Sequence, residues 1–451
     1  MNSINHQAGA RAVVVGLGRS GFSAARYLLA QGFEVAVTDS RAEPPELPRL
    51  EALERELKRK LRVRRGGFDV SLLDGAELLV VSPGVAPSGP FFDAARARGL
   101  PVIGDIELFA RAVRAPVAGV TGTNGKSTVT TLLAQMAVRA GVRIRSGGNL
   151  GQPALDLLDD STELYVLELS SYQLESTHSL SCRAATVLNV SPDHLDRYAD
   201  LAAYAAAKAR IFARCDTAVI NLDDPLVVAM PRAARRTLSF SLRAAIGADY
   251  AVAREHGRWF LTRGGELLLP LAAMKIKGLH NAANALAALA LGEALGLPLP
   301  AMLAELEAFA GLAHRSQWVA DVNGVTYVDD SKGTNVGATL AAVAGMDGPL
   351  VMILGGDAKN QDFTPLAAAF RGKVRHAVLI GRDAALLEQA LAGVCALSRT
   401  TTLPAAVAAA AAAAQPGDTV LLSPACASLD MFKDYAQRGA VFAAAVRDLA
   451  A

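Results

Sequence analysis

Short apolar runs alternate with longer segments of helical pattern along most of the 451-residue chain. This alternation is typical of parallel sheets that are covered by helices. No short repeat period is visible, so a solenoid is not expected. The candidate strands fall into three series: 11–15 and 33–38; then 117–120, 164–169, 185–189 and 218–221; then 325–328, 350–354, 376–380 and 419–422.

The spacing of these series predicts three α/β domains with mostly parallel sheets. We place the first boundary near Ile103-Gly104-Asp105 and the second near Gly311-Leu312-Ala313-His314, after the helical run 281–295. The expected domains are 1–104, 105–311 and 312–451, of which the first and last are Rossmann-like and the central one is a P-loop-type ATPase. Clefts between such domains are natural substrate sites.

Composition narrows the class of protein further. Hydrophobic residues make up 52% and charged residues 20% of the chain, and the net charge is +2, so a globular protein without nucleic-acid partners is expected;. The densest basic run, Lys58 to Arg65, lies beside several glutamates, which favours a solvated helix face. No apolar run reaches membrane-spanning length and no leader pattern is visible, so we expect a cytoplasmic monomer.

The four cysteines are widely spaced and match neither a zinc pattern nor a disulfide framework, which predicts reduced thiols;.

The segment 120–128 is the most informative part of the sequence. It reads Val-Thr-Gly-Thr-Asn-Gly-Lys-Ser-Thr and lies between a candidate strand and a helical run that begins at Val129. Glycine-rich loops in this position bind phosphates through backbone N–H groups, while the lysine reaches a terminal phosphate and a hydroxyl binds Mg²⁺. A strict Walker motif has glycine where Val120 stands, so this is a close variant. A nucleoside triphosphate site is predicted; a simple glycine turn is the alternative.

A second glycine pattern, Gly16-Leu17-Gly18-Arg19-Ser20-Gly21, follows the first candidate strand, and Asp39 ends the next. This is a dinucleotide fingerprint, but its chemistry requires only a diphosphate and a sugar-like group. A nicotinamide cofactor, a nucleotide-sugar diphosphate and a tight turn without ligand all remain possible. Ser82-Pro83-Gly84 ends another apolar run and is expected to line the same crevice.

Three side chains in the central region are candidates for metal binding. Glu168 ends an apolar run, where an acid would face the ligand crevice and coordinate Mg²⁺. His194 follows another strand, between two acids. Lys208 shares an apolar helix face with Tyr204 and Ile211;. Its stem would ordinarily snorkel to solvent; the alternative is a desolvated, neutral amine that reacts with CO₂ to form a carbamate.

Three polar loops follow strand candidates in the last third: 329–335, 355–359 and 423–430. They carry lysines and hydroxyls, and such loops converge at one edge of a doubly wound sheet. This combination suits a small dianionic substrate better than a metal.

These motifs, in this order, resemble the Mur ligases, the ATP-dependent amide-forming enzymes of peptidoglycan synthesis. Nearly the whole chain takes part in the resemblance. The loop around Lys332 and the run 423–430 favour the branch of the family that adds D-glutamate to UDP-N-acetylmuramoyl-L-alanine. The motifs that carry it are Gly104 to Phe109, the phosphate loop, Gly147 to Asn149, Glu168 to Ser171, Asp193 to Arg197, Gly278 to Asn281, His314-Arg315, Asp330 to Lys332 and Ser423 to Asp430.

The resemblance implies roles for the residues at matching positions. ATP would be bound by Gly122, Thr123, Asn124, Gly125, Lys126, Ser127, Thr128, Asn284, Arg315 and Asp330. Two Mg²⁺ ions would be held by Ser127, Glu168, His194 and a carbamate on Lys208. The catalytic residues would be Lys126, His194, Lys208 and Lys332.

The resemblance also implies two substrate sites. The UDP-linked substrate would be bound by Arg19, Ser20, Asp39, Ser40, Arg41, Ser82, Pro83, Gly84 and Asn149. D-glutamate would be bound by Thr334, Lys359, Ser428, Leu429 and Tyr435, together with Lys332. The chain departs from the family pattern at Ser316, Gln317, Gly333 and Tyr435, which touches the ATP and D-glutamate contacts. An NAD-dependent oxidoreductase, a nucleotide switch and a sister ligase that acts on another amino acid or on folate remain alternatives.

Overall fold

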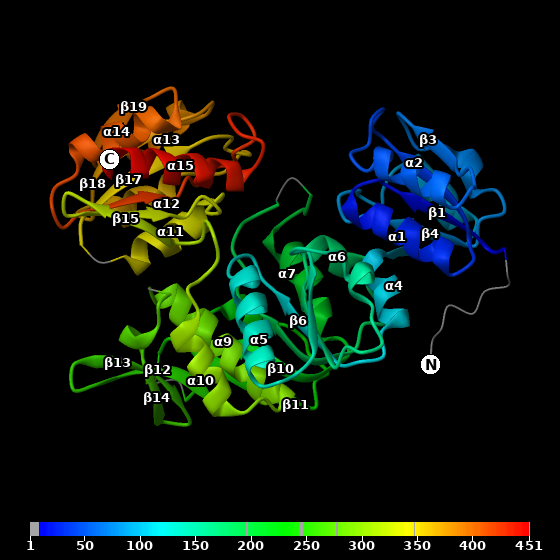
Figure 1. Ribbon diagram of the computed structural model, residues 1–451, viewed down its shortest axis with the longest axis horizontal. Helices are drawn as coiled ribbons and strands as arrows, with labels where there is room; N and C mark the ends of the chain where they lie inside the picture. The colour runs from blue at the N-terminus through cyan, green and yellow to red at the C-terminus, as the bar shows by residue number, and fades with distance from the viewer. Residues whose placement is uncertain (1–8, 195–196, 244–246, 277, 347, 451) are drawn as a thin grey trace.

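The computed structural model describes residues 9–194, 197–243, 247–276, 278–346 and 348–450, and it contains three separate β-sheets. Figure 1 shows them in three bodies, with the N-terminal and C-terminal domains on either side of the central one. The predicted α/β fold class with three domains and mostly parallel sheets is confirmed. Within the described ranges no helix is both long enough and apolar enough to cross a membrane.

The first sheet is a small doubly wound sheet in which all strands are parallel, in the order β3-β2-β1-β4-β5. Strand β1 lies between β2 and β4, so the chain adds strands first on one side of β1 and then on the other. The loops that follow the strands at this switch point form a crevice. The elements are β1 (Arg11–Val15), α1 (Arg19–Ala30), β2 (Glu34–Asp39), α2 (Leu47–Glu56), β3 (Arg62–Arg65), β4 (Leu78–Val81), α3 (Pro90–Ala97) and β5 (Val102–Gly104).

The interpretation of Lys58 to Arg65 as a helix face is wrong. Helix α2 ends at Glu56, and Lys58 has a φ of +50°, which is outside the helical region. Residues Arg62–Arg65 form the edge strand β3, parallel to β2. Charged side chains on an edge strand discourage pairing with another chain, which explains a basic run in this place.

The central sheet has nine strands in the order β14-β13-β12-β11-β10-β9-β6-β8-β7. Strands β13 and β14, at one edge of this sheet, pair antiparallel, and the apolar pattern did not predict them. The strands are β6 (Val117–Thr121), β7 (Ile144–Gly148), β8 (Leu164–Glu168), β9 (Cys182–Val187), β10 (Cys215–Asn221), β11 (Arg236–Ser241), β12 (Tyr250–Glu255), β13 (Arg258–Arg263) and β14 (Glu266–Pro270).

Helices α5 and α9 pack against each other on the central sheet, and α9 is buried along most of its Ala- and Leu-rich length. Helix α5 begins at Lys126 rather than at the expected Val129, because the glycine before it closes the loop directly into the helix. The helices are α4 (Asp105–Ala112), α5 (Lys126–Arg139), α6 (Ser171–Glu175), α7 (Leu201–Ala209), α8 (Pro225–Val228), α9 (Leu279–Leu295) and α10 (Leu299–Ala308).

The third sheet has the order β15-β16-β20-β17-β18-β19, and only β15 is antiparallel to its neighbour. All four cysteines of the chain are free. The elements are β15 (Gln317–Val322), β16 (Val325–Asp329), α11 (Val336–Gly345), β17 (Leu350–Gly355), α12 (Thr364–Phe370), β18 (Val374–Ile380), α13 (Ala384–Leu391), β19 (Ala396–Arg399), α14 (Leu403–Ala413), β20 (Thr419–Leu422) and α15 (Tyr435–Ala450).

Candidate active site

The glycine-rich loop between β6 and α5 is held open by an asparagine that follows β9. Thr123 N donates to the carbonyl oxygen of Asn189 at 2.9 Å, and Asn124 N donates to Asn189 Oδ1 at 2.8 Å. Gly125 has a φ of +83°, and a Cβ added there would lie 2.4 Å from Asn284 Oδ1. Only glycine fits at this position, so the loop conformation is built into its sequence.

Two lysines converge on the inner side of this loop. Lys126 Nζ donates hydrogen bonds to the carbonyl oxygens of Gly122 and Thr123, at 2.9 and 2.8 Å. Lys208 Nζ donates to the same Gly122 oxygen at 3.0 Å and lies 4.3 Å from the centre of the Tyr204 ring. Burial lowers the pKa of Lys208 well below its usual value, and the charge of Lys126 lowers that pKa further. At 1% exposure, the Lys208 side chain does not snorkel to solvent.

Glu168, the last residue of β8, connects the phosphate loop to Asn149. Its Oε2 accepts a hydrogen bond from Ser127 Oγ at 2.6 Å, and its Oε1 accepts one from Asn149 Nδ2 at 2.6 Å. Arg315 Nη2, from the start of the third domain, also donates to Ser127 Oγ at 2.7 Å. A buried carboxylate therefore lies between the phosphate loop and Asn149, and Arg315 of the third domain reaches the same serine.

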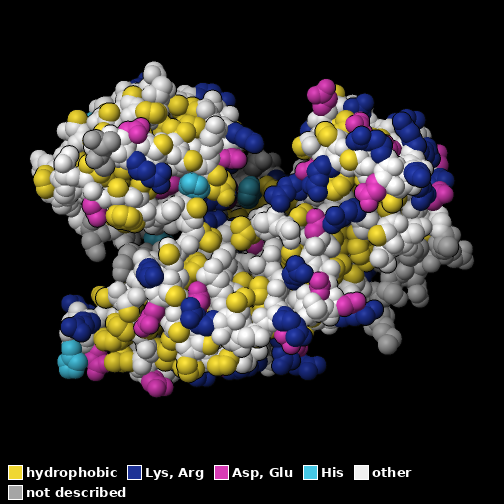
Figure 2. Space-filling model, in the orientation of Figure 1, with side chains coloured by type: hydrophobic (Ala, Val, Ile, Leu, Met, Phe, Trp, Pro, Cys, Tyr) yellow, Lys and Arg dark blue, Asp and Glu magenta, His cyan; other side chains and the backbone are white. Residues whose placement is uncertain are grey.

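All nine residues predicted for the UDP-linked substrate line one cavity of about 530 Å³ between the first and central domains. Gln173 and the Gly148–Gly151 turn complete its wall from the central domain. Figure 2 shows the surface hollowed between the first and third domains, with Lys and Arg side chains along the side that the first domain forms. The structure thus brings the whole set together, and their role in binding stays a prediction.

The three glycines of the first fingerprint differ in what requires them. Gly16 has a φ of +88°, and a Cβ on Gly21 would lie 1.8 Å from the Gly16 carbonyl oxygen, so the turn itself needs both. Gly18 has an ordinary extended backbone, and nothing lies within 4 Å of a Cβ placed there. Gly18 is the N-cap of α1 and lines the cavity, where the missing side chain leaves room for a ligand to approach the backbone;.

Asp39 does not present a free carboxylate to this cavity. Its oxygens accept hydrogen bonds from Leu17 N at 2.6 Å and from the backbone and guanidinium of Arg41 at 2.7–2.9 Å. Burial raises the pKa of Asp39, but the hydrogen bonds from Arg41 and Leu17 outweigh burial, and the pKa lies below its usual value. The half-exposed Arg41 guanidinium therefore offers the cavity positive charge, which suits a diphosphate better than the ribose contact of a nicotinamide dinucleotide.

A second cavity, of about 380 Å³, lies between the central domain and the first part of the third. Asp330 in its wall accepts hydrogen bonds from Ser316 N at 3.0 Å and from Ser423 Oγ at 2.7 Å, and burial raises its pKa to about 7. Seven predicted nucleotide and catalytic residues line this cavity: Asn124, Gly125, Thr128, Asn284, Arg315, Asp330 and Lys332.

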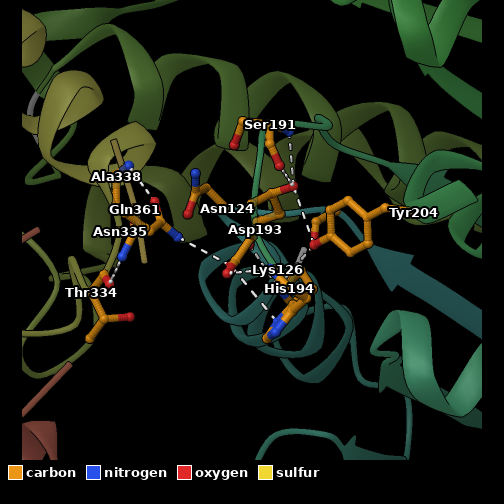
Figure 3. Close-up of polar contacts among 12 residues, drawn as sticks. Asn124, Lys126, Ser191, Asp193, His194, Tyr204, Thr334, Asn335, Ala338 and Gln361 are labelled. Atoms are coloured by element: carbon orange, nitrogen blue, oxygen red, sulfur yellow. Dashed lines mark hydrogen bonds and ion pairs between the residues drawn. The ribbon is translucent and has the colours of Figure 1, made fainter. Parts of the chain in front are cut away.

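His194 lies in the loop after β9, with a φ of +56° and its ring 4.9 Å from the Tyr172 ring. The neighbouring Asp193 accepts a hydrogen bond from Asn335 Nδ2 of the third domain at 3.3 Å. Figure 3 shows Asp193 between Asn335 and His194, close to Lys126. Leu195 and Asp196 of the predicted motif lie outside the described residues.

The residues predicted for D-glutamate are less closely grouped. Lys332 Nζ lies 4.1 Å from the centre of the Tyr435 ring, and burial, with the charges of Arg315 and Lys126, lowers its pKa to about 8. Ser428 is buried, Thr334 is half-buried, and Lys359 and Leu429 are exposed; Leu429 has 69% of its surface accessible.

The oxygen atoms at Ser127 and Glu168 suit Mg²⁺. A hydroxyl and a carboxylate oxygen lie 2.6 Å apart, and Mg²⁺ usually combines one or two such ligands with phosphate oxygens and water;. Within the described ranges no group of three or more His, Cys, Asp or Glu side chains is arranged to hold a metal ion. The Lys208 amine lies 4.3 Å and the His194 ring 6.1 Å from the centre of the Tyr204 ring. As an amine that donates a hydrogen bond, Lys208 is no metal ligand, whereas a carboxylate-like form would be.

Sequence reasoning assigned no role to three residues that hold these groups. Asn189 supports the phosphate loop, Ser423 bonds Asp330, and Arg197 contacts both the first domain and α6. Asn189 ends the candidate strand 185–189 and lies two residues beyond the end of β9, so a strand-end rule like that used for Glu168 would have found it. Ser423 and Arg197 stand at the edges of motifs that the sequence analysis quoted, but their partners lie on distant segments, so the sequence does not show what each of them holds.

Fold and site together define a three-domain nucleotide-dependent enzyme. Its phosphate loop shares the buried carboxylate of Glu168 with the cavity of about 530 Å³ between the first and central domains. Three family models match: "Mur ligase MurD-like, N-terminal domain" over residues 10–104, "Mur ligase middle domain" over 120–292 and "Mur ligase, glutamate ligase domain" over 314–426. The chain belongs to the Mur ligase family, whose members are ATP-dependent ligases that use Mg²⁺.

Curated relatives match over nearly the full length. The protein from Nitrosococcus oceani is 52% identical and covers 98% of both chains, and that from Methylococcus capsulatus is 52% identical over 98% of this chain and 95% of its own. Both are named UDP-N-acetylmuramoylalanine–D-glutamate ligase.

Solved structures share the fold at low identity. UDP-N-acetylmuramate-alanine ligase MurC from Thermotoga maritima has a TM-score of 0.61 at 18% identity, covering 97% of this chain and 99% of its own. A pseudomurein peptide ligase type C from Methanothermus fervidus has a TM-score of 0.58 at 17% identity, covering 92% and 96%.

Proposed function

We propose that this chain uses ATP to join D-glutamate to UDP-N-acetylmuramoyl-L-alanine, forming an amide, ADP and phosphate. The observation that carries the proposal is the position of Glu168. One of its oxygens bonds Ser127 of the phosphate loop, and the other bonds Asn149 in the wall of the UDP cavity. A substrate carboxyl group that extends past Asn149 would therefore meet the terminal phosphate of a nucleotide on the loop. The names of the curated relatives support the same substrates.

The first step activates the carboxyl group. A carboxylate oxygen of the UDP-linked substrate attacks the γ-phosphorus of ATP, the bond from that phosphorus to the bridging oxygen breaks, and ADP leaves. An acyl phosphate remains on the substrate. Lys126, freed from Gly122 and Thr123, would place its ammonium on the transferring phosphoryl group;. Bound Mg²⁺ would offset phosphate charge through Ser127 and Glu168.

The second step forms the amide. The amine of D-glutamate attacks the acyl carbon, the tetrahedral intermediate expels phosphate, and the amine loses a proton to a base. The positive groups of Lys332 and Lys359 would hold the two substrate carboxylates, with Thr334, Ser428, Leu429 and Tyr435 around them. Arg315 and Asp330 would contact the ATP ribose and phosphates, and Asn284 the adenine. Closing the third domain would exclude water that otherwise hydrolyses the acyl phosphate.

Lys208 would act as a carbamate. Its buried amine reacts with CO₂ in the neutral form, and the product is an anion that, with His194, would hold a second Mg²⁺. The lowered pKa of Lys208 and its apolar surroundings support this assignment. The proposed substrates are small soluble molecules, so we infer a cytoplasmic enzyme that needs no nucleic-acid or membrane partner. That the enzyme is a monomer stays a prediction.

Phosphate release across a panel of amino acids tests the proposal. Purified enzyme, ATP, Mg²⁺ and UDP-N-acetylmuramoyl-L-alanine are combined with D-glutamate, L-glutamate, L-alanine, L-lysine or diaminopimelate. We expect release that depends on D-glutamate and on the UDP-linked substrate, and none when either is omitted. A higher kcat/KM with any other amino acid would identify a sister ligase instead.

A further inference from the structure

Arg197 lies between the wall of the UDP cavity and the central domain. Its Nη1 donates to the carbonyl oxygen of Pro83 at 3.2 Å, and Pro83 lines that cavity. Its Nη2 donates to Glu175 Oε2, at the end of α6, at 2.6 Å. The Arg197 side chain is 15% exposed, so these bonds are shielded from water. One guanidinium group thus joins a loop of the first domain to a helix of the central domain.

Arg197 also holds His194 in two ways. Its backbone N–H donates to the carbonyl oxygen of His194 at 3.0 Å. Its guanidinium carbon lies 4.3 Å from the centre of the Tyr172 ring, and the Tyr172 ring lies 4.9 Å from the imidazole of His194. Because the left-handed φ of His194 is unfavourable for a residue with a side chain, this conformation depends on such support;.

We propose that Arg197 is a positioning residue that couples the occupancy of the UDP cavity to the placement of His194. The inference rests on the proposed function of the two cavities. A ligand bound against Ser82, Pro83 and Gly84 fixes the Pro83 carbonyl that the guanidinium grips. The planar, rigid fork transmits that position to Tyr172 and to His194, beside the phosphate loop. Coupling of this kind is reciprocal, so nucleotide with Mg²⁺ should tighten binding of the UDP-linked substrate.

A simple interdomain tether is the competing explanation, and the chain offers a matched control for it. Arg26 Nη2 in the first domain donates to Asp156 Oδ1 in the central domain at 2.8 Å. This bond joins the same two domains, but its central partner lies in the turn 154–157 and not in the His194 loop. Removing Arg26 therefore weakens the domain contact and leaves the Arg197 connection in place.

Calorimetric titration of UDP-N-acetylmuramoyl-L-alanine tests the coupling without turnover. Its Kd is measured for the full chain with and without a non-hydrolysable ATP analogue plus Mg²⁺. For the wild type we expect a Kd ratio of about fivefold or more, as in ordinary allosteric coupling. The ratio should fall to about 1 in Arg197→Met and stay at the wild-type value in Arg26→Met. Arg197→Lys keeps a cation for Glu175, so it should recover thermal stability and still lack the coupling.

Two results would overturn the inference: a wild-type ratio of 1, or the wild-type ratio in both Arg197 variants. The KM for D-glutamate provides a further check. The residues proposed to bind D-glutamate lie in the third domain, whereas the guanidinium of Arg197 bonds the first and central domains. A parallel loss in that KM for Arg197→Lys would indicate general damage and count against coupling. A wild type that binds both ligands but releases no phosphate with D-glutamate would instead refute the proposed function, so the two failures are distinguishable.

Discussion

Lys208 and Gly122 are joined by a 3.0 Å hydrogen bond from the lysine Nζ to the glycine carbonyl oxygen. Lys126 Nζ donates to the same oxygen at 2.9 Å. Burial penalises the charge of Lys208, and the nearby ammonium of Lys126 repels it, so the pKa of Lys208 is lowered and its neutral form is more populated than in an exposed lysine;. The neutral amine is the form that reacts with CO₂.

Replacing Lys208 with alanine should lower kcat by ~10²–10³-fold, because the carbamate that would hold the second Mg²⁺ is lost, and with it the positive charge that this ion would place on the phosphates. Added formate or acetate should restore about tenfold of that loss, since a short carboxylate fits the space of the carbamate. Phosphate release with a series of sodium salts measures the rescue, and chloride is the control. Equal activity in carboxylate and chloride would refute the carbamate.

Replacing Lys126 with alanine should lower kcat by a similar ~10²–10³-fold, because the ammonium group that would stabilise the transferring phosphoryl group is lost. The lost group is a cation, so formate and acetate should restore nothing. ADP release measures turnover, and calorimetry with a non-hydrolysable ATP analogue should report weaker binding. A Lys126→Ala variant that carboxylates reactivate would mean that the two lysines have been assigned wrongly.

The KM for D-glutamate should rise as the pH passes about 8. The pKa of Lys332 is lowered to about 8, first by burial and then by Arg315 and Lys126. Below that pH the lysine is charged and attracts a substrate carboxylate; above it the charge is lost, and KM grows by up to about tenfold per unit. In Lys332→Arg the side chain stays charged, so the rise of KM above pH 8 that comes from the loss of the lysine charge should disappear. Identical pH profiles of the two enzymes would exclude Lys332 from the site.

Gly333→Ala should destabilise the third domain and raise the KM for ATP. A Cβ at Gly333 would lie 2.6 Å from Asp330 Oδ2 and 2.7 Å from Ser423 Oγ, which breaks the hydrogen bond between them. Leaving a buried carboxylate without that donor costs about 1–3 kcal/mol. Denaturant unfolding measures the cost, and Ser423→Ala provides a double-mutant cycle because it removes one clashing atom. Strict additivity in that cycle would contradict the steric argument.

Much of the fold followed from local patterns. The strand candidates 11–15 and 419–422 match β1 and β20 to the residue, since buried parallel strands are short continuous apolar runs;. The strands β13 and β14 were missed because they are antiparallel and partly exposed, and each begins with a charged residue, so neither is a continuous buried run. The basic run 58–65 was assigned to a helix because glutamates precede it, although tertiary pairing with β2 made part of it a strand.

The candidate site also has residues that the sequence could show and contacts that only the structure shows. Glycine loops and strand-end acids are local features, so the two phosphate-type loops and Glu168 could be named from the sequence alone. Asn284, Arg315 and Asn149 were named only through the resemblance to a known family. The partner of Asp39 could not, because a free acid and an acid bound by Arg41 look alike in sequence. Nor could Arg197, whose contacts Pro83 and Glu175 lie far away along the chain.

The sequence by itself determined the order of elements, the glycines that shape two phosphate-type loops and the chemistry available at each strand end. The tertiary structure decided which of those groups meet. It placed Lys208, 86 positions away along the chain, on the carbonyl of Gly122, and it divided the two oxygens of Glu168 between the loop and the UDP cavity. The reason is geometric: parallel strands bring their carboxyl ends to one edge, so loops that are distant in sequence share one small volume.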